Sequence, residues 1–168
     1  MAGAVLAMRV TETITAKLAR ALHSSERDVD LCFEMGLGDM LVQGTASAET
    51  LSGGASADTM VGGLGADTLT GGGGADLFKF AQGDSPLSAT DQITDFQADD
   101  RLDFGLGLAT ATNAVVQSAA SLAAATTQAN QTFAADPALR YVASQVGNNL
   151  HIFASDGDRS QPANMVTL

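Results

Sequence analysis

The 168-residue sequence predicts a mostly-β protein: a short solenoid of parallel strands, then a β-rich C-terminal cap, with helices flanking both. Two observations predict this class. Residues 44–79 repeat every nine residues, and a tandem repeat of that length is typical of a solenoid. Only 5% of the residues are aromatic and Trp is absent, so a large close-packed core is not expected. We expect three regions: 1–34 helical, 35–86 the solenoid, and 87–168 the cap.

The repeat has four units, which read GTASAETLS, GGASADTMV, GGLGADTLT and GGGGADLFK. The pattern is Gly-Gly-x-Gly-x-Asp-x-apolar-x, and the first unit is the weakest, with Thr45, Ser47 and Glu49 at positions two, four and six. Glycine permits positive φ in a tight turn and leaves the backbone carbonyls accessible. The last three residues of each unit predict a short strand that turns one apolar side chain inward. These inward residues are Leu51, Met60, Leu69 and Phe78.

The repeated acids and glycines indicate a site for a hard cation. Each sixth position supplies carboxylate oxygens, and the turns supply carbonyl oxygens. Calcium takes six to eight such oxygens, so the mixture suits calcium better than magnesium or zinc. A flexible Gly-rich linker is the alternative interpretation, but a linker does not place a large apolar residue at every ninth position.

On these motifs the chain resembles the RTX family of secreted calcium-binding proteins. The residues that carry the resemblance are Gly53, Gly54, Asp58, Met60, Gly62, Gly63, Gly65, Asp67, Leu69, Gly71, Gly72, Gly74, Asp76 and Phe78. The resemblance implies a β-roll in which two nonapeptides form one coil and residues eighteen apart share a Ca²⁺ ion. It would stack Glu49 on Asp67 and Asp58 on Asp76. Carboxylates about 4.8 Å apart repel by roughly 1–3 kcal/mol, so calcium binding and folding would be one event.

The resemblance also implies a set of calcium ligands. The candidate metal-binding residues are Glu49, Gly53, Ala55, Ala57, Asp58, Gly62, Leu64, Ala66, Asp67, Gly71, Gly73, Ala75, Asp76 and Asp84. Asp84 and Asp95 follow Asp67 and Asp76 by roughly eighteen residues, and could complete sites at the end of the roll. The alternative for these two is a solvated turn acid. Upstream, residues 36–39 resemble an eroded further repeat that is one residue short.

The charge of the chain limits its partners. Residues 35–100 contain ten acidic residues and one basic residue, Lys79, so this region holds −9 of the formal net charge of −11. Such a concentration argues against nucleic acid or membrane insertion and in favour of cations. No apolar run is long enough to span a membrane, and the N-terminus does not read as a conventional signal peptide. Cys32 is the only cysteine, so calcium would replace disulfides as the stabilising cross-link.

The flanking regions are predicted from periodicity. Residues 4–22 read as an amphipathic helix that would cover one end of the roll, with an interfacial membrane helix as the weaker alternative. Residues 24–34 are expected to form a loop or a short helix. The segment 91–104 resembles the strands that close RTX rolls, with Ile93, Phe96, Leu102 and Phe104 on a buried face.

Residues 114–135 are Ala-rich and predict a helix that ends before Asp136-Pro137. Strands at 141–146 and 149–154 would form a hairpin through Gly147-Asn148, and 165–168 would be a last strand. The Asp-Gly-Asp sequence at 156–158 is expected to form a turn, with an extra calcium site as the weaker alternative.

The sequence contains no recognisable catalytic motif. His23 and His151 are far apart in the sequence, and there is no nucleophile elbow, P-loop or dinucleotide fingerprint. We therefore expect no enzyme activity, and expect calcium binding outside the cell. The family resemblance implies export by the type I secretion machinery, which reads a C-terminal signal. Two alternatives stay open: the calcium-binding and secretion part of a larger extracellular hydrolase, such as a protease or lipase, or a self-associating surface or matrix protein.

Overall fold

The computed structural model describes residues 38–157, 162 and 164–168. The helix expected at 4–22 and the segment 24–34 lie outside the described residues. The elements, in chain order, are β1 (Leu41–Gln43), β2 (Thr50–Gly54), β3 (Thr59–Val61), β4 (Thr68–Gly72), β5 (Leu77–Lys79), β6 (Asp91–Ile93), β7 (Arg101–Asp103), β8 (Ala114–Ser118), α2 (Leu122–Ala135), β9 (Tyr141–Val146), β10 (Asn149–Ala154) and β11 (Asn164–Thr167). The expected mostly-β class is confirmed.

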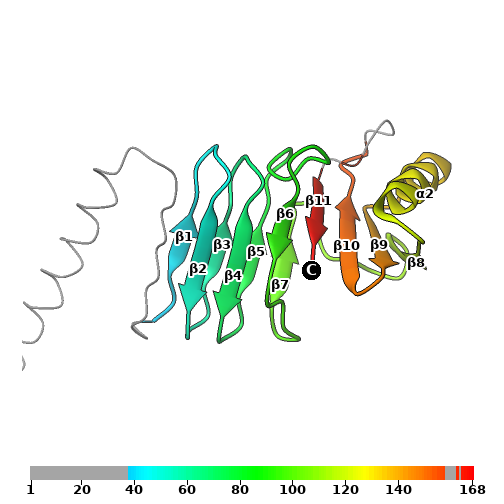
Figure 1. Ribbon diagram of the computed structural model, residues 1–168. Coiled ribbons are helices and arrows are strands. Elements are labelled where there is room, and N and C mark those ends of the chain that lie inside the picture. The colour runs from blue at the N-terminus through cyan, green and yellow to red at the C-terminus, as the bar shows by residue number, and fades with distance from the viewer. Residues whose placement is uncertain (1–37, 158–161, 163) are drawn as a thin grey trace, which may run out of the picture.

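The first seven strands form a β-roll, because the chain alternates between two parallel sheets. One sheet has the order β1-β3-β5-β7, and β2, β4 and β6 lie in the other. Figure 1 shows these strands as successive coils along one axis. Leu51 pairs with Leu69 and Met60 with Phe78, so one coil contains eighteen residues, or two nonapeptides. The predicted register of the repeats is confirmed.

The core of the roll is narrow and consists of the central residue of each repeat strand. Leu51, Met60, Leu69 and Phe78 are fully buried, as predicted, while their neighbours in the strands alternate toward the outside. Each such side chain contributes about 1.5–3 kcal/mol on burial. Phe78 also contacts Phe96, with ring centroids 6.1 Å apart. Burial at every second residue is the reason that these short strands hold one register.

The roll continues past residue 86, where a domain boundary was expected. Leu69 pairs with Ile93 and Phe78 with Leu102, so β6 and β7 each add a further strand to their sheet. These pairs are 24 residues apart rather than eighteen. The six additional residues lie between β5 and β6, in a loop that we call the 80–90 loop. The expected boundary therefore falls inside the roll.

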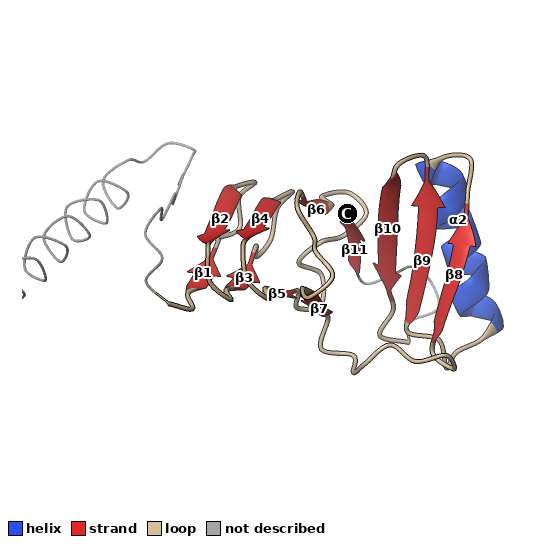
Figure 2. Cartoon of the chain, turned by 90° about the horizontal axis from the view of Figure 1, so that it is seen from below, coloured by secondary structure: helices blue, strands red, loops and turns tan. Residues whose placement is uncertain are grey.

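The C-terminal region extends one sheet of the roll rather than forming a separate layer. This sheet runs β2-β4-β6-β11-β10-β9-β8, with β11 parallel to β6 and antiparallel to β10 (Figure 2). The predicted hairpin of 141–146 and 149–154 and the predicted last strand are confirmed. The C-terminal strand is thus the element that joins the roll to the cap.

The helix expected over 114–135 is correct only from Leu122 onward. Residues 114–118 form β8, which pairs in parallel with β9. Val115 and Val116 are β-branched and suit a strand, and the helix starts where Ser121 accepts a hydrogen bond from the Ala124 N–H (3.2 Å). Ala-rich composition alone therefore placed the helix start too early.

The strand β1 confirms a coil upstream of the four repeats. Val42 is buried and pairs with Met60 of β3. In this register Met40 occupies the position that Asp58 holds one coil later, so Asp39 is one residue out of line with the repeated acids.

In the part of the chain that the structure describes, no helix is long and apolar enough to cross a membrane.

Candidate metal centres

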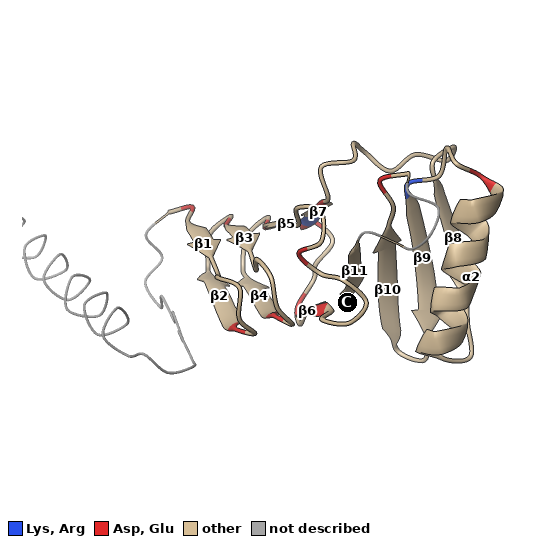
Figure 3. Cartoon of the chain, turned by 90° about the horizontal axis from the view of Figure 1, so that it is seen from above, with Lys and Arg blue, Asp and Glu red and all other residues tan. Residues whose placement is uncertain are grey.

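The repeated acids form two stacks, one on each side of the roll. Each acid immediately precedes a strand, except Asp91, which is the first residue of β6, and parallel strands of one sheet begin at the same edge. Figure 3 shows acidic residues along both edges of the roll. We define the first stack as Glu49, Asp67 and Asp91, and the second stack as Asp58, Asp76 and Asp100.

One carboxylate oxygen of each Asp in the stacks accepts a hydrogen bond from the preceding coil. The Asp67 Oδ1 accepts a hydrogen bond from the Glu49 N–H at 2.9 Å, and the Asp76 Oδ1 accepts from the Asp58 N–H at 2.7 Å. The same bond joins Asp58 to the Met40 N–H, Asp91 to the Asp67 N–H and Asp100 to the Asp76 N–H, at 2.8–2.9 Å. These bonds connect the coils at the points where the acids lie.

The second carboxylate oxygen is buried without a partner. The Oδ2 atoms of Asp58, Asp67, Asp76 and Asp91 have no hydrogen-bond partner within the described residues. All four side chains are at most 3% exposed. An ionised oxygen in this position is unfavourable unless a cation or a donor compensates it. The four unpartnered oxygens are therefore suited to act as ligands of a cation.

Glycine at the first position of the repeat leaves room for these oxygens. A Cβ added to Gly62 would lie 2.5 Å from the Asp67 Oδ2, and one added to Gly53 would lie 2.6 Å from the Asp58 Oδ2. The Gly71 carbonyl oxygen would lie closer still to the Cβ added to Gly53. A carboxylate oxygen and a carbonyl oxygen from the next coil thus converge on one point, which a side chain would fill.

The loop carbonyls divide into bonded and free sets. Carbonyls at the second position accept bonds from the next coil, from Leu64 N–H to Thr45 (3.0 Å) and from Gly73 N–H to Gly54 (2.8 Å). Sixth-position carbonyls are used in the same way. Carbonyls at the third and fifth positions accept none of the loop hydrogen bonds found in the described part of the chain; these are Ala55, Ala57, Leu64, Ala66, Gly73 and Ala75. They are free to face an ion.

Burial makes the carboxyl groups of Asp67, Asp76 and Asp91 hard to ionise. It raises the pKa of Asp67 and Asp76, and the charges of neighbouring acids raise both further. The same causes, burial first and then the charges of Asp67 and Asp84, raise the pKa of Asp91 to about 7. Neutralisation by a bound cation would reverse this effect.

The first and the last acid of the two stacks, Glu49 and Asp100, differ from the other four. The Glu49 Oε2 accepts from the Thr45 N–H (2.6 Å), and the Oε1 accepts from the Thr45 hydroxyl (2.8 Å). At the other end, the Asp100 Oδ2 accepts from the Gln97 N–H (2.7 Å). The carboxylates of Glu49 and Asp100 are thus closed by their own loops, unlike those of Asp58, Asp67, Asp76 and Asp91.

The eighteen-residue spacing that singled out Asp84 and Asp95 was wrong at the end of the roll. Asp91 takes the place one coil after Asp67, and Asp100 takes the place after Asp76. Asp95 instead accepts from the N–H groups of Gly71 (2.9 Å) and Gly72 (2.8 Å). The longer 80–90 loop increases the spacing between successive coils, so the eighteen-residue count no longer applies there.

A local signal could have found both missed residues. Asp91-Gln92-Ile93 and Asp100-Arg101-Leu102 repeat the acid-x-apolar triplet of the nonapeptides. Asp84 bonds to the Ala81 N–H (2.7 Å) and lies near enough to Asp67 and Asp91 to raise the pKa of both.

Side chains alone do not complete a metal site. Within the described residues, no group of three or more His, Cys, Asp or Glu side chains is gathered closely enough to hold a metal ion. An ion between two coils would therefore need the backbone carbonyl oxygens as well. A shell of carboxylate and carbonyl oxygens is typical of calcium.

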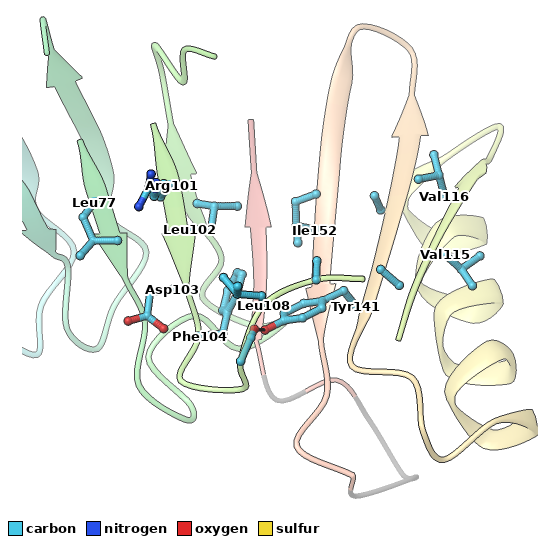
Figure 4. A pocket seen from close by; sticks show the side chains of 14 residues that line it. Leu77, Arg101, Leu102, Asp103, Phe104, Leu108, Val115, Val116, Tyr141 and Ile152 are labelled. Carbon is cyan, nitrogen blue, oxygen red and sulfur yellow. Dashed lines mark hydrogen bonds between the residues drawn. The ribbon is translucent and has the colours of Figure 1, made fainter. Parts of the chain in front are cut away.

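A separate groove of about 580 Å³ lies between β7 and the strands β8, β9 and β10, which together with β11 we call the C-terminal sheet (Figure 4). Its lining is mostly apolar, with Arg101 and Asp103 as the charged residues, and contains no Ser, Cys or His. Tyr141 donates a hydrogen bond to the Gly107 carbonyl there.

His151 lies outside this groove. Its side chain is buried, with the Nδ1 3.0 Å from the Thr167 hydroxyl, and burial lowers its pKa.

The fold and the two stacks define a β-roll with buried carboxylates and unbonded loop carbonyls at the junctions between its coils. The family model of the RTX calcium-binding nonapeptide repeat matches residues 43–78, in four copies. This segment therefore consists of RTX repeats, and the cation that such repeats bind is Ca²⁺.

The chain is similar to a solved structure, the AlgE6R3 subunit of the mannuronan C5-epimerase from Azotobacter vinelandii. The identity is 26%, with 78% of this chain and 70% of that chain covered, and the TM-score is 0.39. A TM-score of this size does not bear on the fold. The search of curated proteins finds no match.

Proposed function

We propose that this chain is a secreted calcium-binding module that folds when it meets Ca²⁺ outside the cell. The observation that carries the proposal is the set of four buried, unpartnered carboxylate oxygens in the stacks. Without a cation these oxygens oppose closure of the roll; with Ca²⁺ they would become ligands. Calcium would also screen the repulsion between stacked carboxylates.

The residues present fit the ion. We propose that the carboxylates of Asp58, Asp67 and Asp76 bind calcium together with backbone carbonyls of the glycine-rich loops. The carbonyl ligands would come from the first, third and fifth positions: Gly53, Ala55, Ala57, Gly62, Leu64, Ala66, Gly71, Gly73 and Ala75. Their support is that the third- and fifth-position carbonyls accept no loop hydrogen bond in the described part of the chain. We assign Glu49 a weaker role, because Thr45 already occupies both of its oxygens.

Calcium levels on the two sides of a cell membrane would control folding. A site with a dissociation constant of about 10⁻⁴ M contributes roughly 1.4 kcal/mol in about 1 mM calcium. Two or three such sites amount to a large fraction of the stability of a small domain. At low calcium inside the cell the roll would stay open, which suits export of an unfolded chain by type I secretion.

The pairing of β11 within the sheet supports this order of events. The secretion machinery passes its substrates unfolded, so export has to take place before this strand is paired. Met165 and Val166 are buried in β11, between β6 and β10. We therefore propose that export precedes folding, and that the folded module has a calcium-dependent structural role rather than a catalytic one.

The test is a calcium titration of the chelator-treated protein followed by far-UV circular dichroism, with magnesium as the ionic control. We expect a cooperative gain of β signal at sub-millimolar to millimolar calcium and none with magnesium. Asp67→Asn should weaken the response. Asp39→Asn, which removes an exposed acid that is out of line with the stacks, should not. A spectrum that calcium leaves unchanged would refute the proposal.

A further inference from the structure

We infer that Asp67 and Asp91 form an additional calcium site that fastens the C-terminal sheet to the roll. The inference rests on the proposed calcium function, and concerns a part of the chain that the nonapeptide repeats do not reach. Asp91 lies thirteen residues beyond the last residue that the family model matches.

The two carboxylates have the same relation as those of the repeats. The Asp91 Oδ1 accepts from the Asp67 N–H at 2.8 Å, as the Asp76 Oδ1 does from the Asp58 N–H. Asp91 is 0% exposed and Asp67 is 1% exposed, and the Oδ2 of each has no partner within the described residues. Asp84 is near enough to add negative charge to both. Two buried, unpaired oxygens and a third charge point to a divalent cation.

The coil that closes this site differs from the others. In the repeats the loop before the acid is glycine-rich and short, but here it is the 80–90 loop. Carbonyl oxygens of the 62–67 loop are available to complete the shell, since Gly62, Leu64 and Ala66 accept no loop hydrogen bond in the described part of the chain. A search for regular repeats would therefore miss the site.

Asp91 is connected directly to the C-terminal strand. Its backbone N–H donates to the Ser85 hydroxyl oxygen (2.7 Å), and that hydroxyl donates to the Met165 carbonyl (2.6 Å). The Met165 N–H returns a bond to the Ser85 carbonyl (2.7 Å). Val166 of β11 pairs with Asp91 itself. An ion that fixes Asp91 thus fixes the residues to which β11 pairs.

A second set of bonds holds the same loop to β11. The Ser85 N–H donates to the Asn164 Oδ1 (3.1 Å), and the Asn164 Nδ2 donates to the Ala81 carbonyl (3.0 Å). Ser85 and Asn164 are both almost fully buried. Calcium binding at Asp91 and docking of β11 depend on the same loop. Each must therefore increase the equilibrium constant of the other by the same factor. Disruption of the Ser85 link should therefore weaken calcium binding at a site that Ser85 itself does not ligate.

The experiment uses the full chain and counts bound calcium by isothermal titration calorimetry, for wild type and three variants. Asp91→Asn keeps the shape and the acceptor for the Asp67 N–H but removes the charge, and should bind one ion fewer. Ser85→Ala should bind the same number of ions, with one of them about 5-fold or more weaker. Thr90→Ala is the control in the same loop, because the Thr90 hydroxyl bonds only to Pro86, at 3.4 Å, and should leave every affinity unchanged.

Tyr141 reports whether the C-terminal sheet stays packed on the roll. It is the only Tyr in a chain without Trp, and its ring lies 6.1 Å from that of Phe104. Its emission at saturating calcium should be that of wild type in Ser85→Ala and Thr90→Ala, which excludes misfolding as the cause of weaker binding in Ser85→Ala. In Asp91→Asn the emission should change toward that of the calcium-free protein, because the ion that fastens the sheet is lost. Equal ion counts and affinities in wild type, Asp91→Asn and Ser85→Ala would overturn this inference and leave the proposed function standing. A wild-type chain that binds no calcium would overturn both.

Discussion

Replacement of Gly62 by Ala is the substitution that most directly tests the geometry of the metal centres. The three atoms nearest to an added Cβ all belong to Asp67, at 2.5 Å for the Oδ2, 3.2 Å for the Cγ and 3.3 Å for the Cβ. Gly62 is not one of the glycines with positive φ, so alanine fits its backbone. The methyl group should therefore displace the Asp67 carboxylate without straining the main chain.

The expected magnitude follows from linkage between binding and folding. When a site is near saturation, each tenfold increase in free calcium adds about 1.4 kcal/mol to the free energy of unfolding for every ion that the folded state binds. A Gly62→Ala chain that has lost one ion should therefore gain about 1.4 kcal/mol less than wild type between 1 and 10 mM calcium. The change lies in the slope of stability against the logarithm of calcium concentration.

The assay is urea unfolding at several calcium concentrations, with Gly105→Ala as the matched control. Gly105 has φ 69° and open space around it, so alanine there should cost roughly 1–2 kcal/mol at every calcium concentration. The control should lower the free energy of unfolding by the same amount at every calcium concentration. Its slope against the logarithm of calcium concentration should therefore equal that of wild type. Equal slopes for wild type and Gly62→Ala would show that the Asp67 oxygen does not bind calcium, and would refute the reasoning.

Two other predictions concern the calcium-free protein and the core. Burial raises the pKa of Asp91 from its ordinary value of 3.8 to about 7, and raises those of Asp67 and Asp76, so the folded state without calcium binds more protons than the unfolded state. Its stability should be greatest below about pH 4 and fall as the pH rises to about 7; circular dichroism in chelator at pH 4.5 and 7.5 checks this, and a roll that is more stable at pH 7.5 would contradict it. Phe78→Ala should cost about 3–5 kcal/mol in saturating calcium, as measured by urea unfolding, because Phe78 is fully buried at the centre of the roll. Leu64→Ala, at a half-exposed loop position, is the control, and a cost for Phe78→Ala as small as that of the control would be inconsistent with the core described here.

The roll was predictable because one short pattern determines several features at once. A nine-residue period places an apolar residue in each strand, an acid before it and glycine in each turn, and two periods return the chain to the same sheet. Leu51 and Leu69, or Asp58 and Asp76, consequently lie where simple counting puts them. The assignment of calcium ligands remains a prediction.

Counting failed where the spacing changes. The 80–90 loop is six residues longer than the count assumed, so Asp91 rather than Asp84 stacks on Asp67. That loop makes a tertiary contact, since the Ser85 hydroxyl donates to the Met165 carbonyl, which is 80 residues away in the sequence. Likewise, β8 is a strand because it pairs with β9, a partner that local Ala content does not reveal. Both errors arose where distant segments determine local structure.

The order in which the roll opens should follow from its two different ends. In the described part of the chain, β1 and β2 have a neighbouring strand on one side only, whereas β6 lies between β4 and β11. In a solenoid each coil is stabilised by its neighbours, so an end coil with one neighbour opens first. The end at β1 also carries Met40 in place of an acid and Glu49 with both oxygens already bonded, so calcium should hold this end least. Native-state hydrogen exchange at half-saturating calcium should therefore show faster exchange in β1–β3 than in β4 and β6. The reverse order would mean that the stability of the roll does not depend on its attachment to β11.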